Sequence, residues 1–255
     1  MGRRSSHPPG AFSWVELSTT DADGAKAFYT SLFGWEIDDN PIPGGGVYTM
    51  LRLGGDAVAA LYQQQVDNQP PNWLSYVTVE SADDAAARVQ ELGGTLITPP
   101  FDVMEVGRMA VISDPQGAVF AIWQPGTHIG AGLVNDPGSL TLNVLNATDP
   151  AAARDFYEGL FGWRFEPVSE VPPFSSVYNG DRLNGGMASI PPDFKLSSHW
   201  LAYFTVADLD AALARVAELG GRVDMGPMDV PAGRFAVVQD PQGAWFALFE
   251  GEVDD

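Results

Sequence analysis

The chain has 255 residues, and its 33 acidic against 13 basic side chains give a formal net charge of −20. This length fits two compact domains. The absence of cysteine excludes disulfides, thiolate nucleophiles, iron–sulfur clusters and zinc–thiolate sites. The negative charge argues against nucleic-acid binding, because phosphate contacts need clustered Lys and Arg. No apolar run is long enough to span a membrane, so we expect a cytoplasmic protein without a membrane partner.

The first module of the chain follows a short tail. Residues 1–10 are polar and rich in Pro and Gly, which predicts a disordered tail. Alternating apolar residues predict a strand over 12–18. Apolar residues at helical spacing predict a helix from about Asp21, a suitable N-cap, to Leu32. Two strand candidates follow, over 46–53 and 57–63.

A second module repeats this order. It has a strand candidate over 73–79, a helix over 82–92, and strands near 107–113 and 118–124. Asp114-Pro115-Gln116-Gly117, between the last two strands, is typical of a turn with Pro at its second position and Gly at its fourth. The predicted element order is therefore βαβββ, twice over.

The second half of the chain repeats the first. Phe28-Tyr29 and Gly34-Trp35 recur as Phe156-Tyr157 and Gly162-Trp163, and the Asp-Pro-Gln-Gly-Ala motif at 114–118 recurs at 240–244. Such long-range similarity at a nearly constant offset indicates a tandem duplication. We predict a first domain over 11–125, a linker over 126–138 and a second domain over 139–251.

These motifs carry a family resemblance. The Phe-Tyr…Leu-Phe-Gly-Trp helix, the Glu-Leu-Gly-Gly helix end and the Asp-Pro-x-Gly turn resemble the vicinal oxygen chelate superfamily, which includes glyoxalase I, bleomycin-resistance proteins and extradiol dioxygenases. The match is closer still to actinobacterial two-domain glyoxalase-like proteins, a group that includes a mycobacterial antigen. The resemblance implies an α+β fold of tandem domains, each with two βαβββ modules around a curved mixed or antiparallel sheet.

The superfamily usually holds a divalent metal on strands that line its cup-shaped sheets. The resemblance places three ligand positions in each domain, which here hold Trp14, Leu74 and Ala121, then Leu142, Leu201 and Ala247. All six are apolar and cannot bind a cation. We therefore expect no cofactor, and a relocated divalent-metal site that uses Glu16 or His199 is the alternative.

Side chains two apart on a strand share a face, which assigns further residues to the cups. The first cup is expected to contain Trp14, Glu16, Tyr76, Ala121 and Trp123, and the second Leu142, Val144, His199, Leu201, Tyr203 and Phe249. Such aromatic pockets suit an organic ligand. Tyr48 and Tyr178, on strands after the first helix of each domain, are expected to offer hydroxyls.

Four polar residues are candidates for chemistry or recognition. Glu16 among aromatic groups would have a raised pKa and could act as a general base or acid; the alternative is a rim carboxylate or one paired with Arg108. His199 could donate to a ligand, or be a surface histidine at a strand end. Arg108 and Arg234 could hold an anionic ligand group, or pair structurally with carboxylates such as Asp102 and Asp229.

The favoured function is metal-independent binding of a small, partly aromatic organic metabolite, with a tailoring or detoxification reaction in one cup. One alternative is non-catalytic sequestration, as in bleomycin-resistance proteins. The second is a metal-dependent glyoxalase-type lyase or dioxygenase. Either a monomer or a homodimer is compatible with four modules in one chain.

Overall fold

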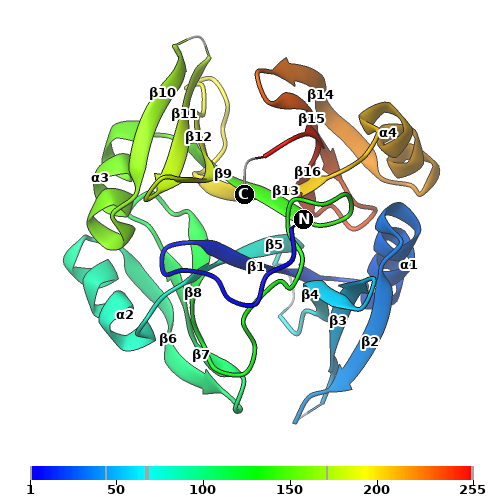
Figure 1. Cartoon of the computed structure of the whole chain (residues 1–255), viewed down its shortest axis with the longest axis horizontal. Helices are drawn as coiled ribbons and strands as arrows, with labels where there is room; N and C mark the ends of the chain where they lie inside the picture. The colour runs from blue at the N-terminus through cyan, green and yellow to red at the C-terminus, as the bar shows by residue number, and fades with distance from the viewer. Residues whose placement is uncertain (1, 44, 67–68, 171, 254–255) are drawn as a thin grey trace.

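The computed structural model describes residues 2–43, 45–66, 69–170 and 172–253, which form two eight-stranded sheets and four helices (Figure 1). The first domain runs β1 (Phe12–Thr19), α1 (Ala22–Phe33), β2 (Glu36–Pro41), β3 (Val47–Leu53), β4 (Asp56–Gln63), β5 (Asn72–Thr78), α2 (Ala82–Glu91), β6 (Thr95–Val103), β7 (Gly107–Ser113) and β8 (Val119–Pro125). The second runs β9 (Leu140–Ala147), α3 (Pro150–Phe161), β10 (Arg164–Glu170), β11 (Pro173–Asn179), β12 (Arg182–Ser189), β13 (His199–Thr205), α4 (Leu209–Glu218), β14 (Arg222–Val230), β15 (Gly233–Gln239) and β16 (Trp245–Gly251).

In each domain the two modules meet at the middle of one mixed sheet. The strand order is β2-β3-β4-β1-β5-β8-β7-β6 in the first domain and β10-β11-β12-β9-β13-β16-β15-β14 in the second. β1 pairs parallel with β4 and antiparallel with β5, which in turn pairs parallel with β8. The predicted α+β class, with paired βαβββ modules in tandem, is therefore confirmed.

The helices begin and end where the local signals predict. The side chains of Asp21 and Asp149 accept hydrogen bonds from N–H groups in the first turns of α1 and α3. Gly34 and Gly162 end the same helices with φ of 71° and 70°, a left-handed conformation that glycine adopts without steric cost.

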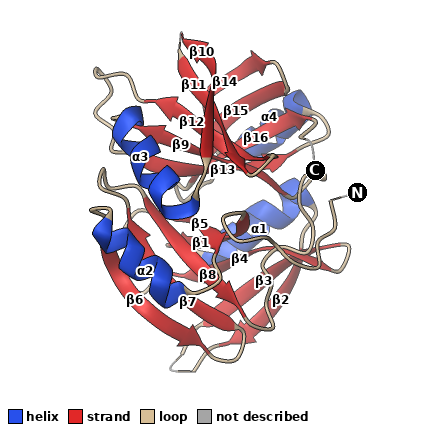
Figure 2. Cartoon of the chain, turned by 60° about the vertical axis from the view of Figure 1, so that its left-hand side comes forward, coloured by secondary structure: helices blue, strands red, loops and turns tan. Residues whose placement is uncertain are grey.

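The two sheets lie back to back, with α1 and α4 together on one side and α2 and α3 on the other (Figures 1 and 2). The cluster around Phe28 of α1 includes Phe246 of the second domain. The cluster around Phe156 of α3 includes Phe120 of the first. Each half of the core is thus shared between domains, and the concave faces of the sheets point away from it.

Two buried hydrogen bonds connect the domains in the same reciprocal way. Tyr29 donates to Asp240 at 3.0 Å, and Tyr157 donates to Asp114 at 3.1 Å. Each aspartate begins an Asp-Pro-Gln-Gly turn and also accepts N–H groups of that turn, as Asp114 does from Ala118 at 2.8 Å. The recurrence of both motifs is explained by this contact between domains.

The N-terminal tail, for which composition predicts disorder, contacts the linker between the domains. The N–H of Arg4 donates to the carbonyl of Gly132 at 2.9 Å, and Arg3 forms a β-bridge with Leu133. The imidazole Nε2 of His7 lies 2.8 Å from the carbonyl oxygen of Ala131. The tail therefore pairs with the linker between the domains, a partner that composition does not reveal.

Two edge strands also lack a sequence signal. β2 and β6 are largely exposed, and they contain Pro41 and the pair Pro99-Pro100. Neither sequence alternates apolar and polar residues, and the burial of β6 alternates only between exposed and half-buried positions. Within the described residues, no helix is both long and apolar enough to cross a bilayer.

Candidate functional site

The first cup is the concave face of the first sheet. The strand register aligns Trp14 with Tyr76 and Tyr76 with Ala121, so these side chains share that face. Trp14, Tyr76 and Trp123 are buried there in one cluster, which Leu74 borders. The positions deduced from spacing therefore do line one surface.

Glu16 lies in the same cup, surrounded by phenol groups. Its carboxyl oxygen Oε2 accepts a hydrogen bond of 2.9 Å from the hydroxyl of Tyr48. That hydroxyl in turn accepts from the indole Nε1 of Trp14 at 3.3 Å. The hydroxyl of Tyr76 lies 3.9 Å from the sulfur of Met109 and close enough to Glu16 to lower the pKa of the carboxyl.

Burial dominates the electrostatics of this group. It raises the pKa of Glu16 above its ordinary value, and the hydrogen bonds from Tyr76 and Tyr48 only partly offset the increase. Burial and then the charge of Glu16 raise the pKa of Tyr48, Tyr62 and Tyr76. All three phenols are therefore held protonated; Tyr48 and Tyr76 donate to the carboxyl group, and Tyr62 lies near its charge.

Tyr62 is the member of this cluster that the sequence does not reveal. It lies on β4, where parallel pairing sets Ala60 against Glu16, and antiparallel pairing sets Tyr62 against Tyr48. Alternation along β4 places Ala60 and Tyr62 on one face, but the register to β1 is needed to bring Tyr62 to Glu16.

A cavity of about 310 Å³ adjoins this cluster at Tyr62. Its other walls come from the β2–β3 hairpin, at Ile42, Pro43 and Val47, and from the end of β4. The size is that of a small-ligand pocket.

The linker covers another part of the first cup. The indole Nε1 of Trp123 donates to the carbonyl of His128 at 2.9 Å, and the His128 ring packs edge-on against Trp14, with centroids 4.7 Å apart. Ala131 is buried in the same cluster. The linker therefore closes this part of the cup, whereas the cavity borders the cluster at Tyr62.

The second cup has the same backbone but different chemistry. Register places Val144, Phe174 and Ala188 where the first cup has Glu16, Tyr48 and Tyr62. Phe174 covers Gly186 so closely that a Cβ there would collide with its ring. Tyr203 and Phe249 are buried in this cup, and burial raises the pKa of Tyr203. Among the described residues that line the cups, a carboxyl surrounded by phenols therefore occurs in the first cup and not in the second.

Two other predicted ligand-binding residues lie at or beyond the edge of the second cup. His199 begins β13, where its Nδ1 lies 2.9 Å from the carbonyl oxygen of Ser197 and its ring packs against Trp245. Tyr178 is outside the apolar cluster of the cup and carries the guanidinium of Arg164 over its ring, 4.6 Å from the centroid. Phe174, four residues earlier on β11, is the residue at the position of Tyr48.

Arg108 and Arg234 do not enter the cups. Arg108 forms ion pairs with Asp83 at the start of α2 and with Asp102. Arg234 pairs with Asp210 of α4, and with Asp229 and Glu250 at longer distance. Alternation explains both, because the cup-facing neighbours are Met109 and Phe235. Both arginines therefore form structural ion pairs, as the alternative to ligand binding predicts. Each also pairs with a carboxylate on a helix, Asp83 or Asp210.

The donor atoms of the cups do not fit a divalent metal. The six positions that carry ligands in the superfamily are apolar, and Glu16 alone supplies a carboxylate in the first cup. No group of three or more His, Cys, Asp or Glu side chains that could hold an ion occurs among the residues described. Metal sites in proteins generally need at least three such ligands.

Comparisons with known proteins agree with this architecture. Residues 11–122 and 139–248 each match the model of the Glyoxalase/Bleomycin resistance protein/Dioxygenase superfamily. CFP32 of Mycobacterium tuberculosis and Mycobacterium bovis, provisionally named a glyoxylase, is 42% identical, with 98% of both chains covered. The anthracycline biosynthesis protein DnrV of Streptomyces peucetius is 36% identical, with 95% of this chain and 94% of DnrV covered.

Solved structures show the same fold at low identity. The Mn(II)-bound glyoxalase of Novosphingobium aromaticivorans aligns with a TM-score of 0.67 and 15% identity over 100% of this chain and 85% of that one. The 2,3-dioxygenase LapB of Pseudomonas sp. KL28 aligns with a TM-score of 0.67 and 16% identity over 96% of this chain and 93% of LapB. With both halves matched and relatives aligned along nearly the whole chain, this protein belongs to the glyoxalase/bleomycin resistance protein/dioxygenase superfamily.

Proposed function

We propose that this protein binds a small, partly aromatic organic molecule in its first cup without a metal ion. Glu16 then moves a proton to or from that molecule in a tailoring or detoxification reaction. One observation carries the proposal: in the first cup a buried carboxyl lies among the phenols of Tyr48, Tyr62 and Tyr76, and Tyr62 also borders a cavity of about 310 Å³.

The chemistry follows from the pKa directions. A carboxyl with a raised pKa holds and releases a proton closer to neutral pH than a solvated one, which suits a general acid or base. The hydrogen bond from Tyr48 to Oε2 orients the carboxyl. The protonated phenol of Tyr62, which lines the cavity, can donate to a carbonyl or phenolic oxygen of the ligand and hold it near Glu16.

The aromatic walls favour a flat ligand. Trp14 and Trp123 are large aromatic side chains of the first cup that the linker covers, so a ligand that contacts them would have to displace His128. DnrV is, by name, a protein of anthracycline biosynthesis, and anthracyclines contain fused aromatic rings with ketone and phenol groups. We therefore assign the ligand to the class of hydroxylated polycyclic aromatic ketones and quinones.

Binding is tested with 1,8-dihydroxyanthraquinone as the probe. We expect saturable quenching of tryptophan fluorescence, with weaker binding in Tyr62→Phe and unchanged binding in the matched control Tyr178→Phe. Both tyrosines are half-buried on strands, but only Tyr62 adjoins Glu16 and the cavity. Equal affinities in the two variants would remove the first cup as the site.

Proton transfer is tested with 2-tetralone, an aromatic ketone with acidic C–H bonds next to the carbonyl. Glu16 would remove one such proton and leave the enolate, which then takes a deuteron in D₂O. Proton NMR should show faster exchange with the wild type than with Glu16→Gln, at equal affinity for the ketone. Binding without exchange in the wild type would favour sequestration over catalysis.

Metal independence is tested separately. Elemental analysis of the purified protein is expected to show no stoichiometric divalent metal, and chelation should leave probe binding and exchange unchanged. A bound metal whose removal abolishes either property would contradict the proposal and favour the metal-dependent alternative.

A further inference from the structure

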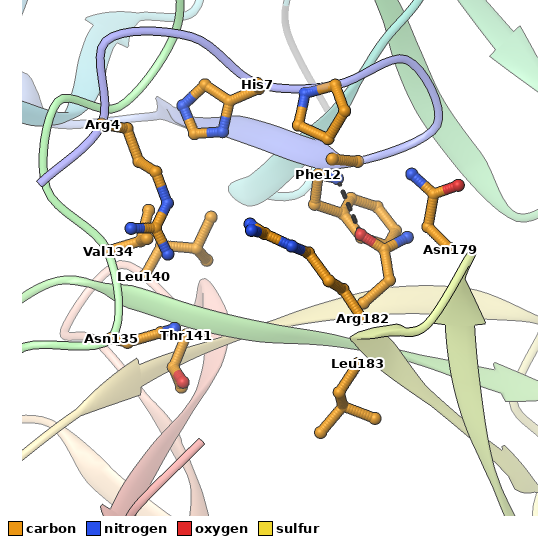
Figure 3. A pocket seen from close by; sticks show the side chains of 13 residues that line it. Arg4, His7, Phe12, Val134, Asn135, Leu140, Thr141, Asn179, Arg182 and Leu183 are labelled. Atoms are coloured by element: carbon orange, nitrogen blue, oxygen red, sulfur yellow. Dashed lines mark hydrogen bonds between the residues drawn. The ribbon is translucent and has the colours of Figure 1, made fainter. Parts of the chain in front are cut away.

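A pocket outside both cups lies where the N-terminal tail crosses the second domain (Figure 3). Its walls come from the tail, from the linker and from β9, β11 and β12 with their connecting turn. The cavity has a volume of about 90 Å³, several times what one water molecule needs. The proposed reaction uses none of its residues.

The charge of this pocket is opposite to that of the chain. The described residues that line it include Arg4, His7 and Arg182 but no Asp or Glu, in a protein with 33 acidic residues. In Figure 3, the guanidinium groups of Arg4 and Arg182 extend into the same space from opposite sides. Within the described part of the chain, the exposed side chain of Arg182 has no ion pair or hydrogen bond. Most other cationic side chains, such as Arg108 and Arg234, pair with carboxylates.

Further groups give the pocket a fixed polar frame. Among the described residues, Thr141 has a buried hydroxyl oxygen with no hydrogen-bond partner. Asn184 is held at both ends of its amide, because Oδ1 accepts from the N–H of Phe12 at 3.2 Å and Nδ2 donates to the carbonyl of Gly10 at 3.0 Å. Asn179 donates to the carbonyl of Pro9 at 2.8 Å. These bonds fasten the tail as one wall of the site.

We propose that this pocket binds the oxyanion group, carboxylate or phosphate, of a small organic molecule. A guanidinium presents parallel N–H donors that match two oxygens of such a group, and Arg182 is placed to supply them. Arg4 adds positive potential, Thr141 with its unpartnered hydroxyl lines the same pocket, and the neutral form of His7, favoured because burial lowers the pKa of its imidazole, can still donate a hydrogen bond. Phe12, Leu140 and Leu183 line the same pocket and would contact the organic part of the ligand.

The site is tested on the full-length protein by NMR titration with inorganic phosphate and, separately, with sodium benzoate. We expect saturable shifts of the amide signals around Arg4, His7, Thr141 and Arg182 with at least one anion. Arg182→Gln should weaken that binding by about tenfold or more, since a charge-assisted hydrogen bond contributes about 1.5–3 kcal/mol. The anion affinity of Arg182→Lys should lie between those of the wild type and Arg182→Gln, because lysine keeps the charge and loses the bidentate geometry.

The matched control is Arg222→Gln, which removes the same charge from β14, where Arg222 pairs with Asp224 outside the pocket. Its anion affinity should equal that of the wild type. Stronger binding of phosphate would indicate a phosphorylated ligand, and stronger binding of benzoate an aromatic carboxylate. Absence of saturable shifts with both anions, or equal losses in Arg182→Gln and Arg222→Gln, would overturn the proposal. Neither result would bear on the first cup, whose probe carries no carboxylate or phosphate.

Discussion

The hydroxyl of Tyr29 in the first domain donates a 3.0 Å hydrogen bond to the carboxylate of Asp240 in the second. The same hydroxyl accepts a bond of 3.0 Å from the indole Nε1 of Trp73. All three groups are buried, so this phenol oxygen satisfies a donor in its own domain and an acceptor in the other. Tyr157, Asp114 and Trp200 repeat the arrangement on the opposite side of the molecule.

Tyr29→Phe should therefore destabilise the whole chain. The substitution leaves the indole N–H of Trp73 unpaired in the core and removes one donor from Asp240, at a cost of about 1–3 kcal/mol. Urea denaturation measures the change in the free energy of unfolding. Tyr178→Phe is the control, since its hydroxyl makes no hydrogen bond within the described residues. Equal stabilities of the two variants would show that the Tyr29 bond contributes nothing net.

Gly94→Ala should also weaken the contact between domains. A Cβ at Gly94 would lie 2.7 Å from Val89 Cγ1, 2.9 Å from the Ser113 carbonyl oxygen and 3.0 Å from the Phe156 ring of the second domain. Forcing these groups apart costs about 1–3 kcal/mol. Thermal denaturation should show a lower Tm than for Gly132→Ala, where the nearest atom to a new Cβ is 3.5 Å away. A Tm equal to that of the control would contradict the close packing seen here.

Glu16→Gln should change how stability depends on pH. Burial raises the pKa of Glu16 above its ordinary value of 4.5, so the folded state holds this proton more tightly than the unfolded chain does. The penalty for the charged carboxylate is present above the folded pKa, and the wild type recovers stability as pH falls through that pKa towards 4.5. Glutamine has no such penalty.

The variant should thus gain stability relative to the wild type at pH 8 and lose this advantage towards pH 4.5. Each unit of raised pKa corresponds to about 1.4 kcal/mol. Unfolding curves recorded across this range for both proteins measure the difference. A difference that does not vary with pH would mean that the pKa of Glu16 is the same in the folded and unfolded states.

Arg108→Gln and Arg234→Gln should leave binding of 1,8-dihydroxyanthraquinone unchanged. Both side chains pair with carboxylates on the helix side of their sheets, through Asp83 and Asp210. Tyr48→Phe, which removes the hydrogen bond to Glu16, provides the positive control with reduced affinity. Fluorescence titration compares the three variants, and a clear loss of affinity in either arginine variant would mean that it reaches the ligand.

The sequence predicts the fold well because the buried elements have strong periodicity. The bounds of β1 differ by one residue from the predicted range 12–18, and the bounds of β7 equal the predicted range 107–113. The repeated motifs then identify the second domain. β2 and β6 escape prediction because both are exposed edge strands with proline, and neither face is buried deeply enough to impose a pattern.

The candidate site is less predictable, because it depends on how distant strands align. Glu16 and Tyr76 follow from alternation on two strands whose faces can be deduced. Tyr62 depends on the parallel register of β1 and β4, which composition does not encode. Arg108 was a candidate because it recurs as Arg234, but duplication preserves structural ion pairs as readily as binding groups. Alternation with Met109 was the signal that could have placed it outside the cup.

The shared cores have a consequence for the origin of the chain. The contacts from α1 to α4 and from α2 to α3 are equivalent under a pseudo-twofold axis, as are the bonds from Tyr29 to Asp240 and from Tyr157 to Asp114. A polypeptide with a single copy of the repeat would expose the apolar face that the other copy now covers. Two such polypeptides would satisfy every one of these contacts by forming a symmetric homodimer. Once both copies are in one polypeptide, their sequences can diverge independently. One sheet can then carry a carboxyl group among phenols while the equivalent positions of the other sheet are apolar.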